Sequence, residues 1–374
     1  MLRLLFILFL LPFFSFSQYS FNKGYDNIEI RGNITTYYKY RWYPSDDELT
    51  SDKINKNLFK LKDVRLKIEG SSNKRDMDYE IHFDFAKSVN GEIPILDAYV
   101  TYNKFIETTI GLHKLNFSRH SRIAIIYSPW LKRAQIIDKG QTRRDVGLHL
   151  SKGFLNDKIQ LFGSVVNGEP SLVSENDIKG GVEYIGRLEL SYPCKMKYRA
   201  IDVSTSPIPV FSFGTSYRHS QKGSNDYMEG EDEIFTKING IKRFYQADFA
   251  LMYRGFSFLS EFHLIDYHWD QTMNLSQEKW STSGVILEGN YFLKKYNSVF
   301  ALRYDNTDVN FYNVDSQNGS VGDITETLSI GYNYRINSHL NVLKIQFRKE
   351  INGGTSAGDP AKYEIRVGLQ YLIG

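Results

Sequence analysis

The sequence has very little cysteine and proline, and it has no long apolar run beyond its first residues. Its single cysteine, Cys194, excludes an intrachain disulfide and a zinc site built from several thiolates. Without a run of about 18 apolar residues after the N-terminal segment, a membrane-spanning helix is excluded there. The formal net charge is only +3, which gives no sign of a nucleic-acid partner. A large chain without disulfides needs another source of rigidity, and a closed β-sheet would supply it.

The N-terminal segment has the pattern of a secretory signal peptide. Arg3 gives a short positive start, Leu4 to Phe14 form an apolar run, and Ser15-Phe16-Ser17 is a small-x-small cleavage site. An uncleaved anchor is the alternative, but the run is too short and wrongly flanked for a spanning helix. We therefore expect a signal peptide at 1–17 and one exported domain at 18–374.

Apolar residues alternate with polar ones through most of the chain. Near the C-terminus, Tyr363, Ile365 and Val367 are separated by Glu364 and Arg366. Successive side chains of a strand point to opposite faces, so this segment has one apolar and one polar face. The same alternation predicts sixteen strands, most of them long enough to cross a bilayer when tilted. The predicted strands are 27–42, 57–70, 77–87, 95–103, 107–114, 144–152, 157–166, 181–192, 209–219, 245–254, 256–267, 280–292, 297–305, 325–336, 339–349 and 362–373.

The connections between the predicted strands alternate between short and long. Short turns follow the second, sixth, tenth, twelfth and fourteenth strands, and longer polar segments lie between them. Outer-membrane barrels have short periplasmic turns and long outer loops, whereas a soluble sandwich has no reason to keep this order. Two connections depart from the pattern: 193–208 is long for a turn, and 87–95 is short for an outer loop. Fourteen or eighteen strands therefore remain as alternatives.

The polar strand faces predict a lumen lined by charges of both signs. A lumen that holds so many charges contains water, and sixteen strands make a barrel wide enough for an aqueous channel. The expected fold class is thus an all-β, 16-stranded antiparallel transmembrane β-barrel. Basic residues at the inward positions of the first two predicted strands are candidates for lining the lumen: Arg31, Lys39, Arg41, Arg65 and Lys67.

The run RRDVGLHLSKGFLNDKIQLFGSVVNGEP at 143–170 resembles the Arg-Asp-x-Gly…Asn-Gly hairpin of the phosphate-selective porin O and P family. Other stretches fit this family in the same order, so the likeness covers most of the mature chain. They include FKLKDVRLKIEG at 59–70, YEIHFDFA at 79–86 and GLHKLNFSRH at 111–120. The resemblance implies a trimeric channel with an inward-folded third loop and passive passage of anions. The chain departs from the family pattern at Gly374, where a terminal aromatic residue is usual.

The third long connection, 115–143, concentrates positive charge where such channels are narrowed. Together with Arg144 it holds seven basic residues and one acid, Asp138. A charged ring in a narrow pore concentrates counter-ions, and the planar arginine fork suits phosphate and carboxylate groups. Alternatively, Arg119 and Arg122 pair with lumen acids such as Asp78, Glu80 or Asp84 and only fasten the loop. The candidate constriction residues are Arg119, Arg122, Lys132, Arg133, Lys139, Arg143 and Arg144.

Three further motifs each have a structural explanation beside a functional one. GTSAG at 354–358 matches a nucleophile elbow but is not followed by a helix. EFHLIDYHWD at 261–270 offers metal ligands on two different strand faces, so a solvated loop end competes with a metal site. MEGEDE at 228–233 could bind divalent ions or be a solvated loop. We assign no catalytic residue and no metal ligand to these motifs.

These patterns predict an outer-membrane porin of a Gram-negative bacterium through which small anions, with phosphate as the natural candidate, diffuse passively. The expected partners are membrane lipid, small anionic solutes and two further copies of the chain, with no cofactor and no nucleic acid. Three alternatives stay open: a non-conducting barrel in a secretion or adhesion assembly, a barrel enzyme, and a soluble secreted β-protein. Conductance, hydrolysis assays and solubility without detergent would separate them.

Overall fold

A computed structural model describes most of the chain outside its N-terminal segment and several connections. The described residues are 19–23, 26–43, 56–72, 76–89, 91, 93–138, 143–168, 181–222, 240–269, 279–309, 323–336, 341–352 and 362–373. Several features expected from the sequence lie outside these ranges. They are the signal peptide, Lys139, the acidic run 228–233, the segment 354–358 and Gly374.

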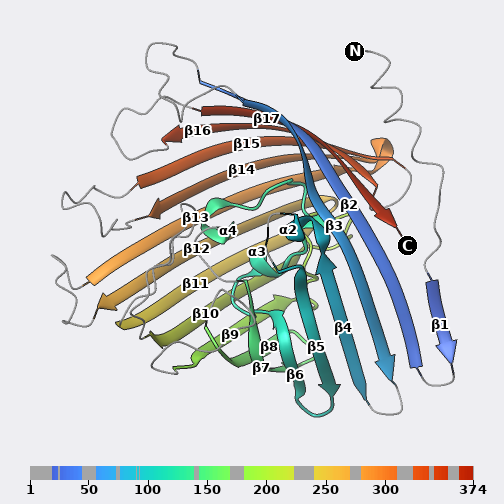
Figure 1. Cartoon of the computed structure of the whole chain (residues 1–374), viewed down its shortest axis with the longest axis vertical. Helices are drawn as coiled ribbons and strands as arrows, with labels where there is room; N and C mark the ends of the chain where they lie inside the picture. The colour runs from blue at the N-terminus through green and yellow to red at the C-terminus, as the bar shows by residue number, and fades with distance from the viewer. Residues whose placement is uncertain are drawn as a thin grey trace.

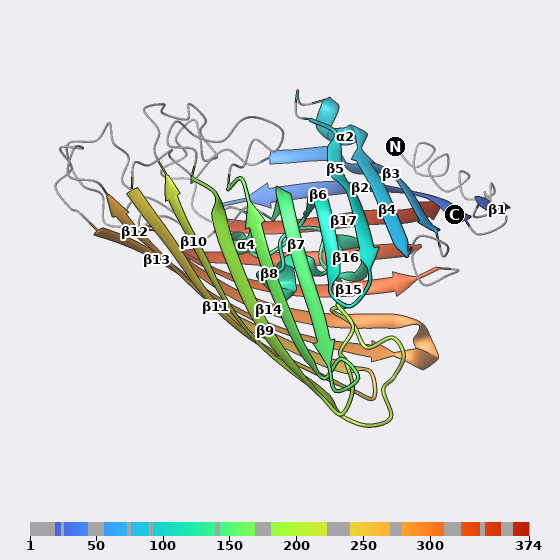
Figure 2. The same ribbon diagram turned by 90° about the horizontal axis from the view of Figure 1, so that it is seen from below.

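Sixteen strands, β2 to β17, form one antiparallel sheet that closes on itself within the described part of the chain (Figures 1 and 2). Each strand pairs with its neighbours in sequence, and β17 pairs with β2 to complete the ring. The predicted sixteen-stranded barrel is therefore confirmed. The strands are β2 (Asp26–Trp42), β3 (Lys56–Ser72), β4 (Met77–Asp84), β5 (Ile95–Asn103), β6 (Glu107–Lys114), β7 (Arg144–Phe154), β8 (Ile159–Val166), β9 (Glu183–Tyr192), β10 (Val210–Lys222), β11 (Gly240–Tyr253), β12 (Phe256–Trp269), β13 (Lys279–Leu293), β14 (Ser298–Val309), β15 (Asp323–Arg335), β16 (Val342–Asn352) and β17 (Lys362–Ile373).

A short strand that the alternation did not predict, β1 (Tyr19–Lys23), precedes the barrel. It pairs with the start of β2, where Tyr19 lies opposite Ile30. The pairing of β17 with β2 ends nearby, with Ile373 opposite Gly32. β1 therefore covers the edge of β2 that extends beyond the end of β17.

The alternation of side chains gives the barrel an apolar outer face and a polar inner face. In β17, Ile365 and Leu369 are each 37% exposed on the outside, whereas Glu364 and Gln370 are 2% and 1% exposed on the inside. The outer face thus presents the apolar band that a lipid-facing barrel requires. No helix in the described ranges is long and apolar enough to cross a membrane.

The connection between β6 and β7 folds into the barrel and is called the inner loop here (residues 115–143, described at 115–138 and 143). It contains α3 (Arg119–Arg122), the 3-10 turn η2 (Ile125–Tyr127) and α4 (Gln135–Asp138). Figures 1 and 2 show α3 and α4 surrounded by the strands. The inward-folded third loop is therefore confirmed. The remaining short helical elements are α2 (Phe85–Ser88) and η3 (Lys294–Tyr296).

Apolar side chains of the inner loop form a core inside the barrel. Phe117, Ile136 and Ile137 are buried with Phe244 of β11 and Ile286 of β13. In this barrel, burial of apolar surface holds the loop against the wall from β9 to β13.

The connection 193–209 breaks the alternation of short and long connections because it also enters the barrel. Met196 and Ala200 pack with Ile123 of the inner loop in a second buried cluster. Asp202, which is buried, accepts hydrogen bonds from the backbone N–H groups of Ser206 (2.8 Å) and Gly255 (3.0 Å). The sequence already marked this connection as too long for a turn, and the structure places its extra residues inside the barrel.

Candidate functional site

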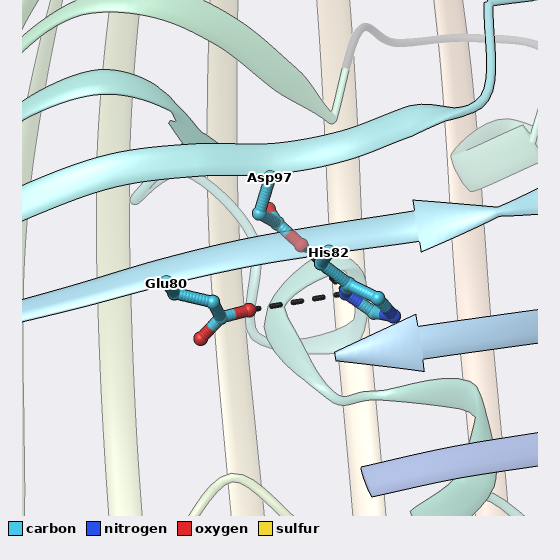
Figure 3. Close-up of side chains that lie close together, drawn as sticks. All are labelled: Glu80, His82 and Asp97. Carbon is cyan, nitrogen blue, oxygen red and sulfur yellow. Dashed lines mark hydrogen bonds and ion pairs between the residues drawn. The ribbon is translucent and has the colours of Figure 1, made fainter. Parts of the chain in front are cut away.

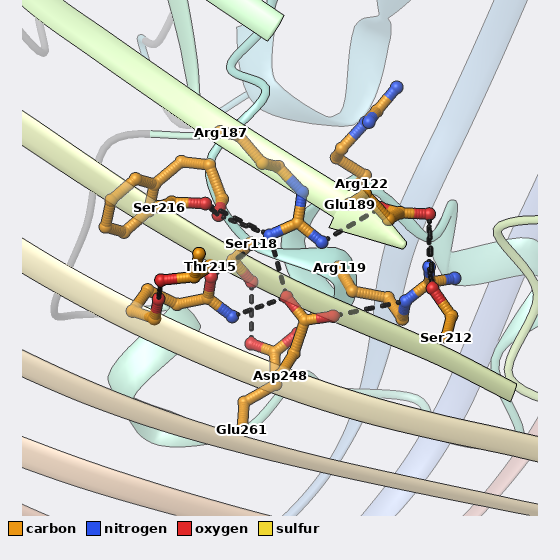
Figure 4. A network of polar contacts seen from close by, with 12 residues as sticks. Ser118, Arg119, Arg122, Arg187, Glu189, Ser212, Thr215, Ser216, Asp248 and Glu261 are labelled. Atoms are coloured by element: carbon orange, nitrogen blue, oxygen red, sulfur yellow. Dashed lines mark hydrogen bonds and ion pairs between the residues drawn. The ribbon is translucent and has the colours of Figure 1, made fainter. Parts of the chain in front are cut away.

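A buried network of charges holds the inner loop against β9, β10 and β11 (Figure 4). Arg187 of β9 makes ion pairs with Glu189 (2.9 Å) and Asp248 (2.7 Å). Arg119 of the inner loop reaches the same two carboxylates, with 3.3 Å between its Nε and Asp248. The Arg187 guanidinium also donates to the carbonyl oxygen of Phe117 at 3.1 Å. Two guanidinium groups therefore balance two carboxylates, and the first part of the loop is fixed to the wall.

Side chains on β14, β16 and β17 hold the second part of the inner loop through its backbone carbonyl groups. Lys344 donates to Ser128 at 2.8 Å, Gln346 to Pro129 at 3.0 Å and Gln370 to Ile126 at 3.2 Å. Arg303 donates to the carbonyl of Lys132 at 3.1 Å, and its guanidinium lies 4.7 Å from the ring centre of Trp130. The loop thus crosses the lumen from one wall to the other.

Glycines on the inner wall leave space for apolar side chains of the loop. A β-carbon built on Gly284 would lie 2.6 Å from Ile136, and one on Gly368 would lie 2.9 Å from Leu131. One on Gly331 would lie 3.2 Å from Trp130. Because glycine has no side chain, these three positions leave small spaces, called sockets here, that loop side chains fill. The loop can therefore approach the wall closely.

One arginine inside the inner loop fastens it to itself. Arg133 donates to the carbonyl oxygens of His120 and Ile123, each at 2.7 Å. Hydrogen bonds from a charged donor are stronger than those between neutral groups. Arg133 therefore acts as a clamp between α3 and the segment before α4.

The inner loop leaves a cavity of about 540 Å³ beside β2, β3 and β4, which is called the passage from here on. Eleven lysines and arginines line it, against four acids. The basic residues are Arg31, Lys60, Lys62, Arg65, Lys67, Lys87, Lys114, Lys132, Arg133, Arg143 and Arg144, and the acids are Asp63, Glu80, Asp84 and Asp138. The passage is strongly positive although the whole chain is close to neutral.

A β-bulge adds cations to this lining that simple alternation would miss. The register of β3 against β2 shifts between Thr35 and Thr36, and Lys62 is the residue without a partner opposite it. As a result, Lys60, Lys62 and Asp63 all line the passage. The sequence carried no local signal for the bulge, because Lys and Asp are also ordinary inward residues.

Some cations of the passage are neutralised by acids and others are not. Arg65 pairs with Asp63 (2.6 Å) and Asp84 (3.0 Å). Five basic residues of the lining make no ion pair with an acid among the described residues. Arg133 uses its guanidinium on loop carbonyls, which leaves Lys60, Lys114, Lys132 and Arg143. Lys132 projects into the lumen from the loop, where limited access to water and the nearby Arg366 guanidinium lower its pKa to about 8. These four residues are the strongest candidates for contact with a permeating anion.

One group of potential metal ligands lies within the described ranges, and it consists of Glu80, His82 and Asp97 (Figure 3). His82 Nδ1 lies 3.0 Å from Asp97 and 3.8 Å from Glu80. Cations already neutralise both carboxylates, since Lys67 lies 2.9 Å from Glu80 and Arg144 binds Asp97 through two bonds of 2.9 and 3.0 Å. A divalent ion would have to displace these cations. Acidic and basic side chains therefore pair with one another here, which explains the group better than a metal site does.

The structure separates the predicted constriction residues into two groups. Lys132, Arg133, Arg143 and Arg144 line the passage. Arg119 instead lies at the wall formed by β9 to β11, and Arg122 lies against Phe162 of β8 and Tyr198. Arg119 has ion-pair partners there, as the alternative proposed, but they are Glu189 and Asp248 rather than the acids of β4.

The predicted lumen cations also divide. Arg31, Arg65 and Lys67 line the passage. Lys39 and Arg41 pair with Glu364 instead, at 3.8 and 3.5 Å. In the segment 261–270, Glu261 and His263 point inward and lie 2.9 Å apart, so the described part of that motif forms an inward pair rather than a metal cluster.

No protein-family model matches the chain, and no curated protein matches its sequence. Solved structures of outer-membrane proteins do match its fold. The anion-selective porin from Comamonas acidovorans has a TM-score of 0.61 at 9% identity, over 93% of this chain and 100% of that one. The outer membrane channel DcaP of Acinetobacter baumannii has a TM-score of 0.57 at 15% identity, over 94% and 99%. A loop L8 deletion mutant of OmpT, an outer membrane protein of Vibrio cholerae, has a TM-score of 0.61 at 9% identity, over 93% and 99%. At these identities the likeness shows the fold alone: this chain is a closed antiparallel barrel of the kind found in outer-membrane porins.

Proposed function

We propose that this protein is an outer-membrane porin through which small anions diffuse passively. The observation that carries the proposal is the passage beside β2, β3 and β4, whose lining holds eleven basic residues and four acids. A narrow pore with low-dielectric walls focuses the field of such charges and raises the local concentration of anions. The similarity to an anion-selective porin supports the same function.

The pairing of charges along the passage suits transport better than tight binding. Conduction requires that an ion be attracted into the pore and also released from it. Lys132 and Arg143 attract the anion at the inner loop, while Arg65 and Lys67 share their charge with Asp84 and Glu80. An anion that moves along this wall meets several moderate sites in succession rather than one deep trap.

Membership of the phosphate-selective porin O and P family, a cleaved signal peptide and a trimeric assembly belong to the same proposal. They rest on the sequence resemblance and on the pattern of the N-terminal segment. In an outer-membrane porin the short turns face the periplasm and the long connections face the outside of the cell, and we propose the same orientation for this barrel. Phosphate is the first anion to test, since arginine and lysine both bind its oxygens well.

The test is the reversal potential of the purified protein in a planar bilayer across a KCl gradient, followed by current block with added phosphate. A potential on the anion side, with block by phosphate, is the expected result. An unselective or cation-selective current would reject anion selectivity and keep the porin. A folded, heat-modifiable barrel without any current would reject the channel and favour a role in a secretion or adhesion assembly.

A further inference from the structure

The inner wall of the barrel has two faces of different charge. The wall beside the passage is rich in lysine and arginine, whereas the wall from β9 to β14 carries only three buried arginines (Arg187, Arg218 and Arg303) against six buried acids among its described residues. They are Glu183, Glu189, Asp248, Glu261, Glu288 and Asp305, each at most 2% exposed. An open lumen would expose both faces, and the acids would attract cations into the same pore.

The inner loop contacts five of these six acids. Beyond the bonds of Arg119 to Glu189 and Asp248, Ser118 donates to Glu261 at 2.7 Å. His120 lies 3.6 Å from Glu288, and the backbone N–H of Gln135 donates to Asp305 at 3.3 Å. The loop therefore covers the acidic wall with its own donors and leaves the basic wall open.

The connection 193–209 completes this cover from the end of the barrel that carries the short turns. Tyr198 donates its hydroxyl hydrogen to Glu189 at 2.7 Å and accepts a hydrogen bond from Arg122. Its ring lies 4.9 Å from the Arg119 guanidinium and 3.9 Å from that of Arg122. Asn290 of β13 also donates to the carbonyl of Ala200 at 2.9 Å, which ties the connection to the wall.

Tyr198 stands at the boundary between the covered network and the solvent. Glu189 and Arg119 are each 1% exposed, whereas Tyr198 is only partly buried. Its ring lies against the guanidinium groups of both Arg119 and Arg122. Loss of this ring would open Glu189 to water from the short-turn end without changing any residue that lines the passage.

We propose that Tyr198 is a selectivity-determining residue, which keeps the carboxylate of Glu189 and the acidic wall behind it out of the permeation path. This inference rests on the proposed function, since it needs a conducting, anion-selective barrel. It assigns a role in selectivity to a residue of a short-turn connection that does not touch the passage.

The experiment compares the chloride-to-potassium permeability ratio of the full-length protein and four variants in planar bilayers. Tyr198→Ala is expected to lower the ratio by about threefold, because water that reaches Glu189 weakens its ion pairs with Arg119 and Arg187, and a carboxylate so released in a confined lumen concentrates cations. Tyr198→Phe keeps the ring and is expected to retain most of the ratio. Tyr198→Ala with Glu189→Gln is expected to restore it. Cys194→Ser, an uncharged change in the same connection at an exposed residue, is the matched control.

The outcomes separate this inference from the proposed function. An anion-selective wild type with an unchanged Tyr198→Ala variant rejects the inference alone, as does a fall that Glu189→Gln does not reverse, since that would be a purely structural effect. A folded wild type without anion selectivity rejects the proposed function and this inference with it. Should Tyr198→Ala fail to give a heat-modifiable barrel, Tyr198→Leu takes its place with the same expectation, because it keeps packing volume without the ring.

Discussion

Gly284 on β13 is the socket for Ile136 of the inner loop: a β-carbon at position 284 would lie 2.6 Å from Ile136 Cγ1. The Ile136 side chain therefore occupies the space that a side chain at position 284 would need. Ile136 is 1% exposed, so it has no free space into which it could retreat. We expect the width of the passage on the far side of the loop to depend on this contact.

We predict that Gly284→Ala pushes the inner loop off the wall and toward the passage. Overpacking of this kind costs about 1–3 kcal/mol. The single-channel conductance should fall, while the barrel remains heat-modifiable. Gly284→Ala combined with Ile136→Ala should recover conductance, because the second change makes room for the new methyl group. Equal conductance in the wild type and the single variant would show that the socket does not set the pore width.

The cations of the inner loop that lack an acidic partner should contribute most to selectivity. Lys132→Ala and Arg143→Ala should each lower the chloride-to-potassium permeability ratio by about twofold or more, since a focused field loses one charge. Lys195→Ala is the control, because Lys195 is exposed outside the passage and pairs with Asp157 at 3.2 Å. A control variant that changes the ratio as much as Lys132→Ala would contradict the passage as the site of selection.

Anion selectivity should fall as the pH rises through about 8. The pKa of Lys132 is lowered to about 8 by limited access to water and then by Arg366, and an ammonium group loses its charge above its pKa. Asp138 and Glu364 act in the opposite direction, and Arg348 adds to the lowering. The reversal potential is measured across a KCl gradient, with the same pH on both sides of the bilayer, over this range. In Lys132→Arg the side chain stays charged, so the fall in anion selectivity near pH 8 should disappear. If the fall remains in this variant, another group causes it.

Arg133 should be needed for the shape of the inner loop rather than for its charge. Its two bonds, to the carbonyls of His120 and Ile123, are each worth about 1.5–3 kcal/mol when the donor is charged. Arg133→Ala and Arg133→Lys should both give larger and noisier single-channel currents, because lysine cannot span both carbonyls. If Arg133→Lys behaves as the wild type, the charge and not the clamp is what matters.

The strands could be predicted from the sequence because the alternation of apolar and polar residues is a pattern of neighbouring positions. Alternation such as that of Glu364, Ile365 and Arg366 assigns each side chain to a face, and the structure keeps that assignment. The bulge at Lys62 was not visible, because it depends on the register between β2 and β3 rather than on either strand alone. Lys60 and Lys62 therefore could not be placed from alternation, whereas Arg65 and Lys67 beyond the bulge could.

The surroundings of the inner-loop side chains were harder to predict than the inward or outward direction of the strand side chains. The charge of Arg119 and Arg143 is identical, and both lie in the same loop, but one faces Glu189 and the other faces the passage. Which one is paired depends on where the loop crosses the barrel, and that path is set by contacts far apart in the sequence. The unusual length of 193–208 was the available signal that something else entered the lumen.

The anchors of the inner loop also have a consequence for how the protein is made. The bond from Gln370 to the Ile126 carbonyl joins residues 244 positions apart, and that from Lys344 to Ser128 joins residues 216 apart. Contacts between distant residues form slowly, because a long stretch of chain must be ordered first. Until β16 and β17 are in place, these loop carbonyls have no partners from the wall. The second part of the inner loop therefore gains these wall contacts only with the last two strands, so its path is complete only in the closed barrel.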